Sequence, residues 1–322
     1  MTPLNAPARP MHFRKMWDVC LRLFSWISVA IALGGMAWIL FSVFKIGAGI
    51  ISWDFIVNPI RAVTGTFTEE MAAYQTDFDM MKDFLSPEEL ARYTPPIPVG
   101  VGNAIMGTLS ITFFASLITV PLAILAGIYI AEFGKNGPFS NFLRFSANVL
   151  MGIPSIIIGF FVYAVVVKTT GNASGFAGSV ALSIIMFPVI MRTTEDMMSM
   201  VPVALRESAL ALGMTRMRTT ICIVARSAKN GLTTGVLLAL ARVSGETAPL
   251  LMTAKMAESW PGADSFFTNV TANLPVLINN FSNDTNVPAA NEVAWGAAMV
   301  ICTIILLINV ATRILFTDKH KR

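Results

Sequence analysis

The sequence predicts an all-α membrane protein with six transmembrane helices. Of its 322 residues, 55% are hydrophobic and only 13% are charged, about half the charged fraction of a typical soluble domain. The mean hydropathy is +0.66. Six long apolar runs each approach the roughly 20 residues that a helix needs to cross a bilayer. These runs do not alternate apolar with polar residues as the strands of a membrane barrel do, so helices are expected.

The six expected spans form one transmembrane domain over residues 23–316, with no visible internal repeat. Short tails, 1–22 and 317–322, flank this domain. The first run is too long for the apolar part of a signal peptide and is expected to remain as a helix. The spans are expected at about residues 23–50, 104–131, 145–167, 175–194, 231–254 and 293–315.

The distribution of lysine and arginine predicts the orientation in the membrane. Sixteen of the 23 fall in the two tails and in the second and fourth loops, and six fall on the other side. Because basic residues are retained on the cytoplasmic side, both termini and the loop 196–230 are expected to be cytoplasmic. The net charge of +4 is therefore a topology signal, and nucleic acid is not an expected partner.

Several classes of chemistry are not expected. The three cysteines have neither the spacing of a metal site nor that of a disulfide framework. No phosphate-binding loop of the type Gly-x-x-x-x-Gly-Lys-Ser/Thr is present. No nucleophile with its partners is evident, so the chain is not expected to be an enzyme by itself. If transport needs ATP and Mg²⁺, another chain must bind them.

The first long loop on the non-cytoplasmic side contains an acidic insert, residues 61–94. Thr66 and Glu69 fit a capping box at the start of a helix, and apolar residues then recur at steps of three and four. Two interpretations stay open. The apolar face packs on the membrane domain or lipid headgroups, or it is a docking surface for a soluble partner.

The four middle spans each contain an interior proline, namely Pro121, Pro154, Pro188 and Pro249. Proline removes a backbone hydrogen bond and kinks a helix, and in lipid neighbours or a cavity must satisfy the freed carbonyl. We therefore expect spans two to five to form the working bundle, with the first and last spans peripheral. The alternative is that prolines are simply common in membrane helices.

The cytoplasmic loop 196–230 predicts two short helices joined by a turn. Pro202 opens the first helix, Gly213 can end it in the left-handed conformation, and Thr215 can cap the second. This helix–turn–helix either transmits the movement of a partner that changes shape or is an ordinary solvated loop. The spacing of its apolar residues does not distinguish the two.

Within this loop, the run from Glu207 to Gly213, followed by Ile223, resembles the signature of ABC importer permeases. The stretches "VPVALRESALALG", "GIPSIIIGFFVYAVVV" and "GLTTGVLLALARVSGETAPLLMTA" are similar to the phosphate-specific importer, and Gly245–Leu250 favours its PstA type. The resemblance covers about residues 23–52 and 100–316. It departs from the general motif at Ser208, where alanine is usual, and at Ala225-Arg226, where Leu-Pro is usual.

The resemblance implies a type I importer permease in the bacterial inner membrane. Its cytoplasmic helix is expected to couple to an ATPase. The residues implied in coupling are Arg206, Glu207, Ser208, Ala209 and Gly213. The implied partners are a PstC-like permease, two PstB-like ATPase subunits that bind ATP and Mg²⁺, and an extracytoplasmic phosphate-binding protein. The surrounding bilayer is a further partner. Whether a phosphate-sensing regulator also binds is left open by the sequence.

Two charges, Arg242 and Glu246, interrupt the fifth apolar run. A charge at mid-bilayer costs about 2.5–3.5 kcal/mol on insertion scales, so such residues usually have a partner. Four residues apart, the two can pair on one helix face. Gly245 removes bulk beside them, and Pro249 leaves the Gly245 carbonyl without a helical donor.

We expect Arg242 to bind phosphate in the substrate pathway, since guanidinium offers paired donors at any relevant pH. Glu246 would form an ion pair with Arg242 while the path is empty. This competition keeps phosphate from binding so tightly that it cannot leave. The resemblance, which places functional residues in the run Arg-x-x-Gly-Glu-Thr, adds Thr247 to the pathway. Because glycine and proline allow a helix to bend, the gate is expected to use the kink residues Gly245, Pro249, Pro188 and Pro154. The competing interpretation is a buried ion pair that only orders the bundle.

The other polar residues at span ends are interpreted as interfacial anchors. Glu132 ends the second span. Arg192, Glu195 and Asp196 end the fourth, where they can pair along the helix. For these three the alternative is a role in the substrate path.

Three further functions stay open for the whole chain: a permease for sulfate or molybdate, a membrane scaffold for phosphate signalling, and an ion channel. A scaffold would tolerate loss of Arg242, and a channel would not need the ATPase-docking segment.

Overall fold

The computed structural model describes residues 11–60, 76–77, 80–81, 100–134, 137–283 and 288–316. Residues 1–10 and the tail 317–322 lie outside these residues, whereas residues 11–22, expected as a cytoplasmic tail, continue the first helix, which begins at Met11. Most of the helix expected to start at Thr66 in the insert 61–94 also lies outside them; its residues 76–77 and 80–81 are helical. The described part contains helices and loops and no strand, which confirms the all-α prediction. The α-helices are α1 Met11–Gly47, α2 Trp53–Val57, α5 Gly102–Ile128, α6 Pro138–Gly152, α7 Ser155–Val162, α8 Lys168–Thr170, α9 Gly175–Ser199, α10 Val203–Ala211, α11 Arg216–Thr219, α12 Ala225–Ser244, α13 Ala248–Thr253, α14 Ala263–Thr268, α15 Leu274–Asn283 and α16 Pro288–Phe316. Three π-helical stretches are η1 Tyr129–Gly134, η2 Tyr163–Val167 and η3 Thr220–Val224.

Four helices in the described part are long and apolar enough to cross a membrane. They are Trp17–Gly47, Gly102–Gly134, Gly175–Ser199 and Ala290–Val310. A fifth span results if Pro138–Gly152 and Ser155–Thr170 are counted together, although the chain bends there by 105°. The prediction of a membrane-spanning helical domain therefore holds, while six separate straight spans are not found.

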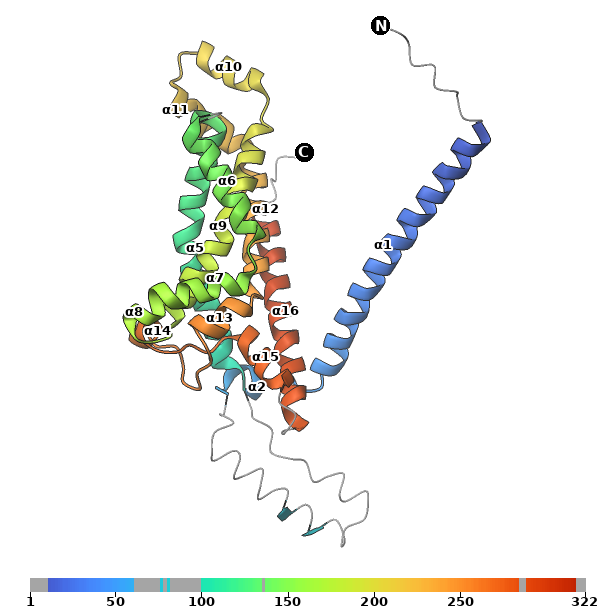
Figure 1. Ribbon diagram of the computed structural model, residues 1–322, viewed down its shortest axis with the longest axis vertical. Helices are drawn as coiled ribbons and strands as arrows, with labels where there is room; N and C mark the ends of the chain where they lie inside the picture. The colour runs from blue at the N-terminus through green and yellow to red at the C-terminus, as the bar shows by residue number, and fades with distance from the viewer. Residues whose placement is uncertain are drawn as a thin grey trace.

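The centre of the bundle is α9, which packs against α5 and α12 along its length (Figure 1). Hydroxyl groups connect α5 and α9 at successive turns. The Ser179 hydroxyl lies 3.1 Å from the Ile111 carbonyl oxygen, and the Ser183 hydroxyl lies 3.2 Å from that of Ala115. Each shares its proton with a carbonyl of its own helix, that of Gly175 at 3.0 Å and that of Ser179 at 2.7 Å. Thr119 donates in the other direction, to the Ser183 carbonyl at 3.3 Å. Small residues allow this close approach, because a Cβ on Gly127 would lie 2.7 Å from the Met191 carbonyl oxygen.

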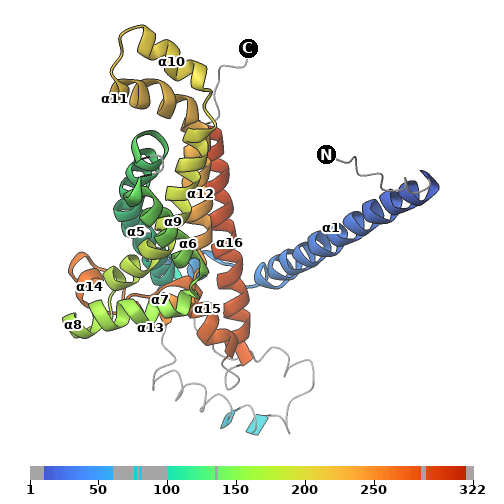
Figure 2. The same cartoon turned by 45° about the horizontal axis from the view of Figure 1, so that its top comes forward.

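The expected span 145–167 is wrong as a single helix. Helix α6 ends at Gly152, Ile153 takes an extended conformation (φ −79°, ψ 129°), and α7 begins after Pro154. The physical cause is Pro154, which disfavours helical backbone at the preceding residue and cannot donate to the preceding turn. Helix α7 consequently runs across the bundle instead of along it in both views (Figures 1 and 2).

The expected span 231–254 is also divided. Helix α12 begins earlier, at Ala225, and ends at Ser244, and the separate helix α13 begins at Ala248. Pro249 lies in the first turn of α13, where a missing N–H is tolerated. The prediction of one continuous helix kinked at Pro249 is therefore wrong: the chain breaks four residues earlier.

The first span is peripheral, as expected. Only 6% of the apolar window of α1 is buried, and the helix diverges from the bundle (Figure 1). It meets α16 near its end, where a Cβ on Gly47 would lie 2.8 Å from the Cβ of Met299. The last span is less peripheral than expected, because Val293 and Ala297 of α16 are fully buried in a cluster with α15.

The two ends of the bundle carry different structures. At one end, here called the α10 end, α10 and α11 form the expected helix–turn–helix, with Gly213 in the left-handed conformation (φ +82°). The opposite end, the α15 end, carries α2, α14 and α15 (Figure 1). There the buried Asn103 donates to the carbonyls of Ala257 and Glu258 and accepts from the Ile60 N–H.

Candidate functional site

A cavity of about 280 Å³ lies between the two breaks in the helices. One wall is the bend between α6 and α7, another is the middle of α9, and a third is the end of α12. The breaks are close together because α7 packs against α13: a Cβ on Gly159 would lie 2.7 Å from the Cα of Pro249. The lining residues are Leu150, Met151, Gly152, Ile153, Pro154, Ser155, Ile158, Ile185, Val189, Arg242 and Glu246.

Arg242 and Glu246 are the charged residues of this lining. Arg242 is exposed and Glu246 is partly buried. No ion pair or hydrogen bond joins either side chain to another group in the described part of the chain. The expectation that Glu246 holds Arg242 is therefore wrong in this conformation. The reason is local, because α12 ends at Ser244 and the two residues do not occupy one helix face.

The other residues of the expected pathway and gate are distributed around the cavity. Pro154 lines it, while Pro249 is buried behind it in α13 and Pro188 is buried inside α9. Thr247 is not among the lining residues; its carbonyl instead accepts hydrogen bonds from the N–H groups of Leu250 and Leu251. The structure thus gathers Arg242, Glu246 and Pro154 at one cavity and leaves Thr247 outside it.

Gly245 has no steric reason to be glycine in this conformation. Its φ is −100°, a value that any residue adopts, and an added Cβ would meet nothing within 4 Å. We expect Gly245→Ala to change uptake by no more than about twofold, since neither strain nor overlap results. Transport assays normalised to membrane abundance check this. A large loss of uptake would mean that another conformation needs the free space.

Glu195 is the centre of a second group of charges, closer to the α10 end. Its carboxylate accepts from Arg144 Nε at 2.7 Å and from Arg192 at 2.9 Å. The residue is 8% exposed, and its ion pair with Arg144 joins α6 to α9. The pairing with Arg192 follows from the i,i+3 spacing, whereas Arg144 is 51 residues away and was missed.

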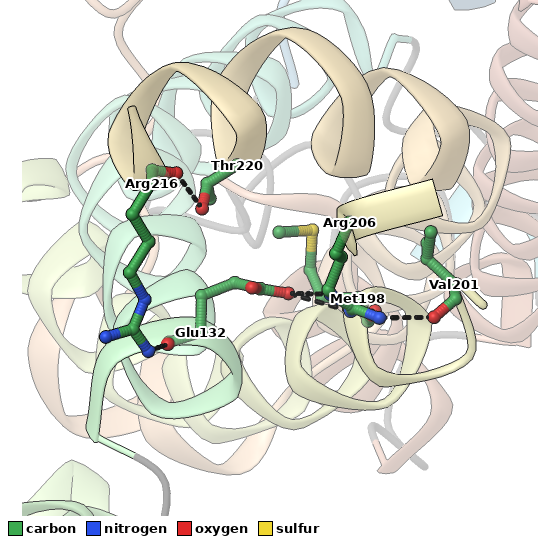
Figure 3. A network of polar contacts seen from close by, with 6 residues as sticks. All are labelled: Glu132, Met198, Val201, Arg206, Arg216 and Thr220. Atoms are coloured by element: carbon green, nitrogen blue, oxygen red, sulfur yellow. Dashed lines mark hydrogen bonds and ion pairs between the residues drawn. The ribbon is translucent and has the colours of Figure 1, made fainter. Parts of the chain in front are cut away.

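At the α10 end, Arg206 points into the bundle (Figure 3). Its guanidinium contacts Glu132 Oε1 at 2.8 and 3.0 Å and donates to the carbonyls of Met198 and Val201. Glu132 lies at the end of its span, as expected, and is 8% exposed. Among the other residues expected to couple to an ATPase, Glu207 and Ser208 are exposed on α10 and Gly213 ends the turn, but Ala209 is buried.

No group of three histidine, cysteine, aspartate or glutamate side chains in the described residues could hold a metal ion. Within the same residues, the cavity and the two groups near the α10 end bring together arginine and glutamate side chains.

Comparison with known protein families assigns the sequence to one of them. The profile described as "binding-protein-dependent transport system inner membrane component" matches residues 123–318, more than half of the chain. The chain belongs to this family. As a family member it is a membrane-spanning permease subunit of an ABC transporter.

Curated relatives of this permease extend over nearly the whole chain. The phosphate transport system permease protein PstA of Haemophilus influenzae is 36% identical over 310 residues, 96% of each chain. The PstA of Pasteurella multocida is 42% identical over 222 residues, which cover 69% of this chain and 78% of the relative. PstA 1 of Mycobacterium tuberculosis H37Rv is 32% identical over 318 residues, covering 96% and 92%.

A solved structure supports the fold of the permease. A chain from inward-facing structures of the MetNI methionine ABC transporter superposes with a TM-score of 0.52 at 17% identity. The superposition covers 67% of this permease and 92% of that chain. At this identity the likeness concerns the fold alone.

Proposed function

We propose that this permease is one subunit of an ATP-driven importer that moves inorganic phosphate across the bacterial inner membrane. The observation that carries the proposal is the alignment with PstA proteins over up to 96% of both chains. The aligned region includes the cavity with Arg242, which gives the substrate assignment a chemical basis.

The cavity suits a small oxyanion, whose oxygen atoms can accept hydrogen bonds from the Arg242 guanidinium. Arg242 brings five N–H donors that no other described group occupies, and it remains charged at every physiological pH. Apart from Arg242 and Glu246, the lining is apolar or uncharged. A volume near 280 Å³ also leaves room for several waters, at about 30 Å³ each, beside the anion.

Glu246 has a separate role in this proposal. Its carboxylate repels the phosphate that Arg242 attracts, so that the anion does not remain in one deep well. Transport requires binding that is favourable enough for entry and weak enough for release. Because the two side chains are not paired here, Arg242 can accept phosphate without first breaking an ion pair.

The broken helices supply the means of alternating access. Substrate sites of transporters commonly lie where discontinuous helices leave backbone groups at mid-membrane. Here the α6–α7 bend and the α12–α13 break face the same cavity. Rotation about Pro154 and about residues 245–247 would expose Arg242 to one side and then to the other.

The complete importer in this proposal contains other chains. A PstC-like permease provides the other half of the pathway, two PstB-like subunits bind ATP and Mg²⁺ on the cytoplasmic side, and an extracytoplasmic protein delivers phosphate. The α10 end and both termini then face the cytoplasm, consistent with the basic residues of loop 196–230. A phosphate-sensing regulator is a further candidate partner at this face.

The test is uptake of ³²P-phosphate into proteoliposomes that contain this chain, its partner permease, the ATPase and the binding protein. We expect ATP-dependent uptake that excess unlabelled phosphate abolishes and excess sulfate or molybdate leaves unchanged. Competition by sulfate or molybdate would indicate another oxyanion permease. Absence of any ATP-dependent uptake, with the complex assembled, would favour the signalling scaffold.

Glu207→Lys tests the exposed face of α10. Glu207 is exposed and makes no ion pair in the described residues, so the change should not disturb the fold. If α10 seats on the ATPase, charge reversal should reduce uptake by about tenfold or more through lost complementarity. ATPase recovered with the affinity-tagged permease is measured in parallel. Unchanged flux without bound ATPase would favour a channel.

A further inference from the structure

A buried ion pair outside the cavity joins α10 to η1, at the end of α5. Arg206 lies in α10, beside Glu207, and its ion pair with Glu132 spans 74 residues of sequence. Both nitrogens Nε and Nη2 contact the same carboxylate oxygen, at 3.0 and 2.8 Å. The side chains of Arg206 and Glu132 are only 19% and 9% exposed. A pair so shielded is screened far less by salt than a surface pair.

The same arginine also fastens α10 to α9. Its remaining donors reach the carbonyls of Met198, at 2.7 Å, and Val201, at the terminal turn of α9. The Met198 carbonyl also accepts from the Val201 N–H at 3.3 Å, so Arg206 adds a side-chain bond to the backbone turn that ends α9. One guanidinium therefore joins three elements, α5, α9 and α10, and Figure 3 shows it between them.

Glu132 reaches Arg206 from a π-helical turn. In η1, Tyr129–Gly134, the wider turn replaces the last α-helical turn of α5. Such insertions are rare and often occur at functional positions. A second arginine also contacts this turn. Arg216 donates to the Glu132 carbonyl, and its guanidinium carbon lies 5.2 Å from the centre of the Phe133 ring.

We propose that the Arg206–Glu132 pair is the link that transmits movement of α10 to α5 and α9, and so to the cavity. The inference rests on the proposed function, in which α10 seats on the ATPase. Arg206 and Glu132 are positioning residues in this scheme, since neither contacts the substrate. Without the pair, α10 could follow the ATPase while the ends of α5 and α9 remain in place.

The test uses the assembled importer with Glu132→Gln, which keeps the shape of the side chain and removes its charge. We expect phosphate transported per ATP hydrolysed to fall by about tenfold, within the range of measured coupling effects. ATP hydrolysis itself should persist. Asp196→Asn is the matched control, because Asp196 is an exposed acid near the end of α9 without an ion pair in the described residues.

A double-substitution cycle separates a pair from two independent effects. Glu132→Gln combined with Arg206→Gln should lower the ratio of phosphate to ATP no more than the worse single change does. Additive losses would overturn the proposal. So would a ratio in Glu132→Gln equal to that of Asp196→Asn, and so would failure of Glu132→Gln to assemble, because the pair would then be a folding element.

A distance measurement does not depend on the identity of the substrate. Spin labels are placed at Val203 in α10 and at the exposed Leu125 in α5, with the three native cysteines replaced by serine. The distance should stay constant when the ATP-bound state of the parent complex is trapped, and should change in Glu132→Gln. A distance that already changes in the parent would overturn the proposal even if phosphate uptake is normal.

Discussion

Arg242→Gln is expected to abolish phosphate uptake while the protein still reaches the membrane. A hydrogen bond to a charged group contributes about 1.5–3 kcal/mol, and each 1.4 kcal/mol is about tenfold in affinity. Loss of two such bonds to phosphate therefore lowers uptake by about 100-fold or more. Stability should change little, because Arg242 is exposed and has no partner in the described residues. Uptake of ³²P-phosphate and an immunoblot of the membrane fraction measure the two effects.

Arg226→Gln is the matched control for this substitution. Arg226 is exposed on the same helix, α12, and does not line the cavity. Its uptake should remain near that of the parent. If Arg242→Gln retains full uptake, Arg242 is not in the pathway. If the protein itself is lost from the membrane, the interpretation that the charged pair orders the bundle gains support.

Gly159→Ala is expected to destabilise the permease by about 1–3 kcal/mol, as overpacking of a filled interior does. The added Cβ would lie 2.7 Å from the Cα of Pro249 and 3.2 Å from the Pro249 carbonyl oxygen. Backbone atoms cannot rotate away, so α7 and α13 must separate. The two helix breaks that border the cavity would then move apart, and uptake should fall together with the melting temperature.

Gly34→Ala controls for the general effect of replacing a helical glycine. Gly34 lies in α1 with nothing within 4 Å of a built Cβ, so this change should leave the melting temperature equal or slightly higher. Thermal unfolding followed by loss of monodisperse protein in detergent compares the two variants. Equal melting temperatures would show that α7 and α13 are not held in this close contact.

Composition predicts which runs become helices but not where a helix breaks. The runs at residues 23–50 and 104–131 form α1 and α5, because apolar length alone decides their helical state in lipid. The breaks at Pro154 and at Gly245 divide two other runs. The proline at 154 was a readable signal for the first break. For the second break, Gly245 at the end of α12 and Pro249 in the first turn of α13 are also local signals, but Pro249 was interpreted as a kink inside one helix and not as the start of a new one.

The same division applies to the candidate site. Arg242 and Glu246 were recognisable because charge is costly in an apolar run, yet their pairing was wrong because it assumed a continuous helix. Arg144 and Glu195, and likewise Glu132 and Arg206, are 51 and 74 residues apart. Their partnerships depend on tertiary packing, and a single sequence gives no spacing rule for them.

The hydroxyl contacts between α5 and α9 limit the kinds of motion open to the bundle. Ser179, Ser183 and Thr119 bond to carbonyls of the facing helix at successive turns. In a bilayer no water can replace these bonds while one helix slides past the other. A shift by one residue would break these interhelical contacts together, while Ser179 and Ser183 would keep only the bonds to carbonyls of their own helix. We therefore expect α5 and α9 to keep their mutual register throughout the transport cycle, so that access alternates by hinge rotation at the helix breaks and not by shear between these two helices.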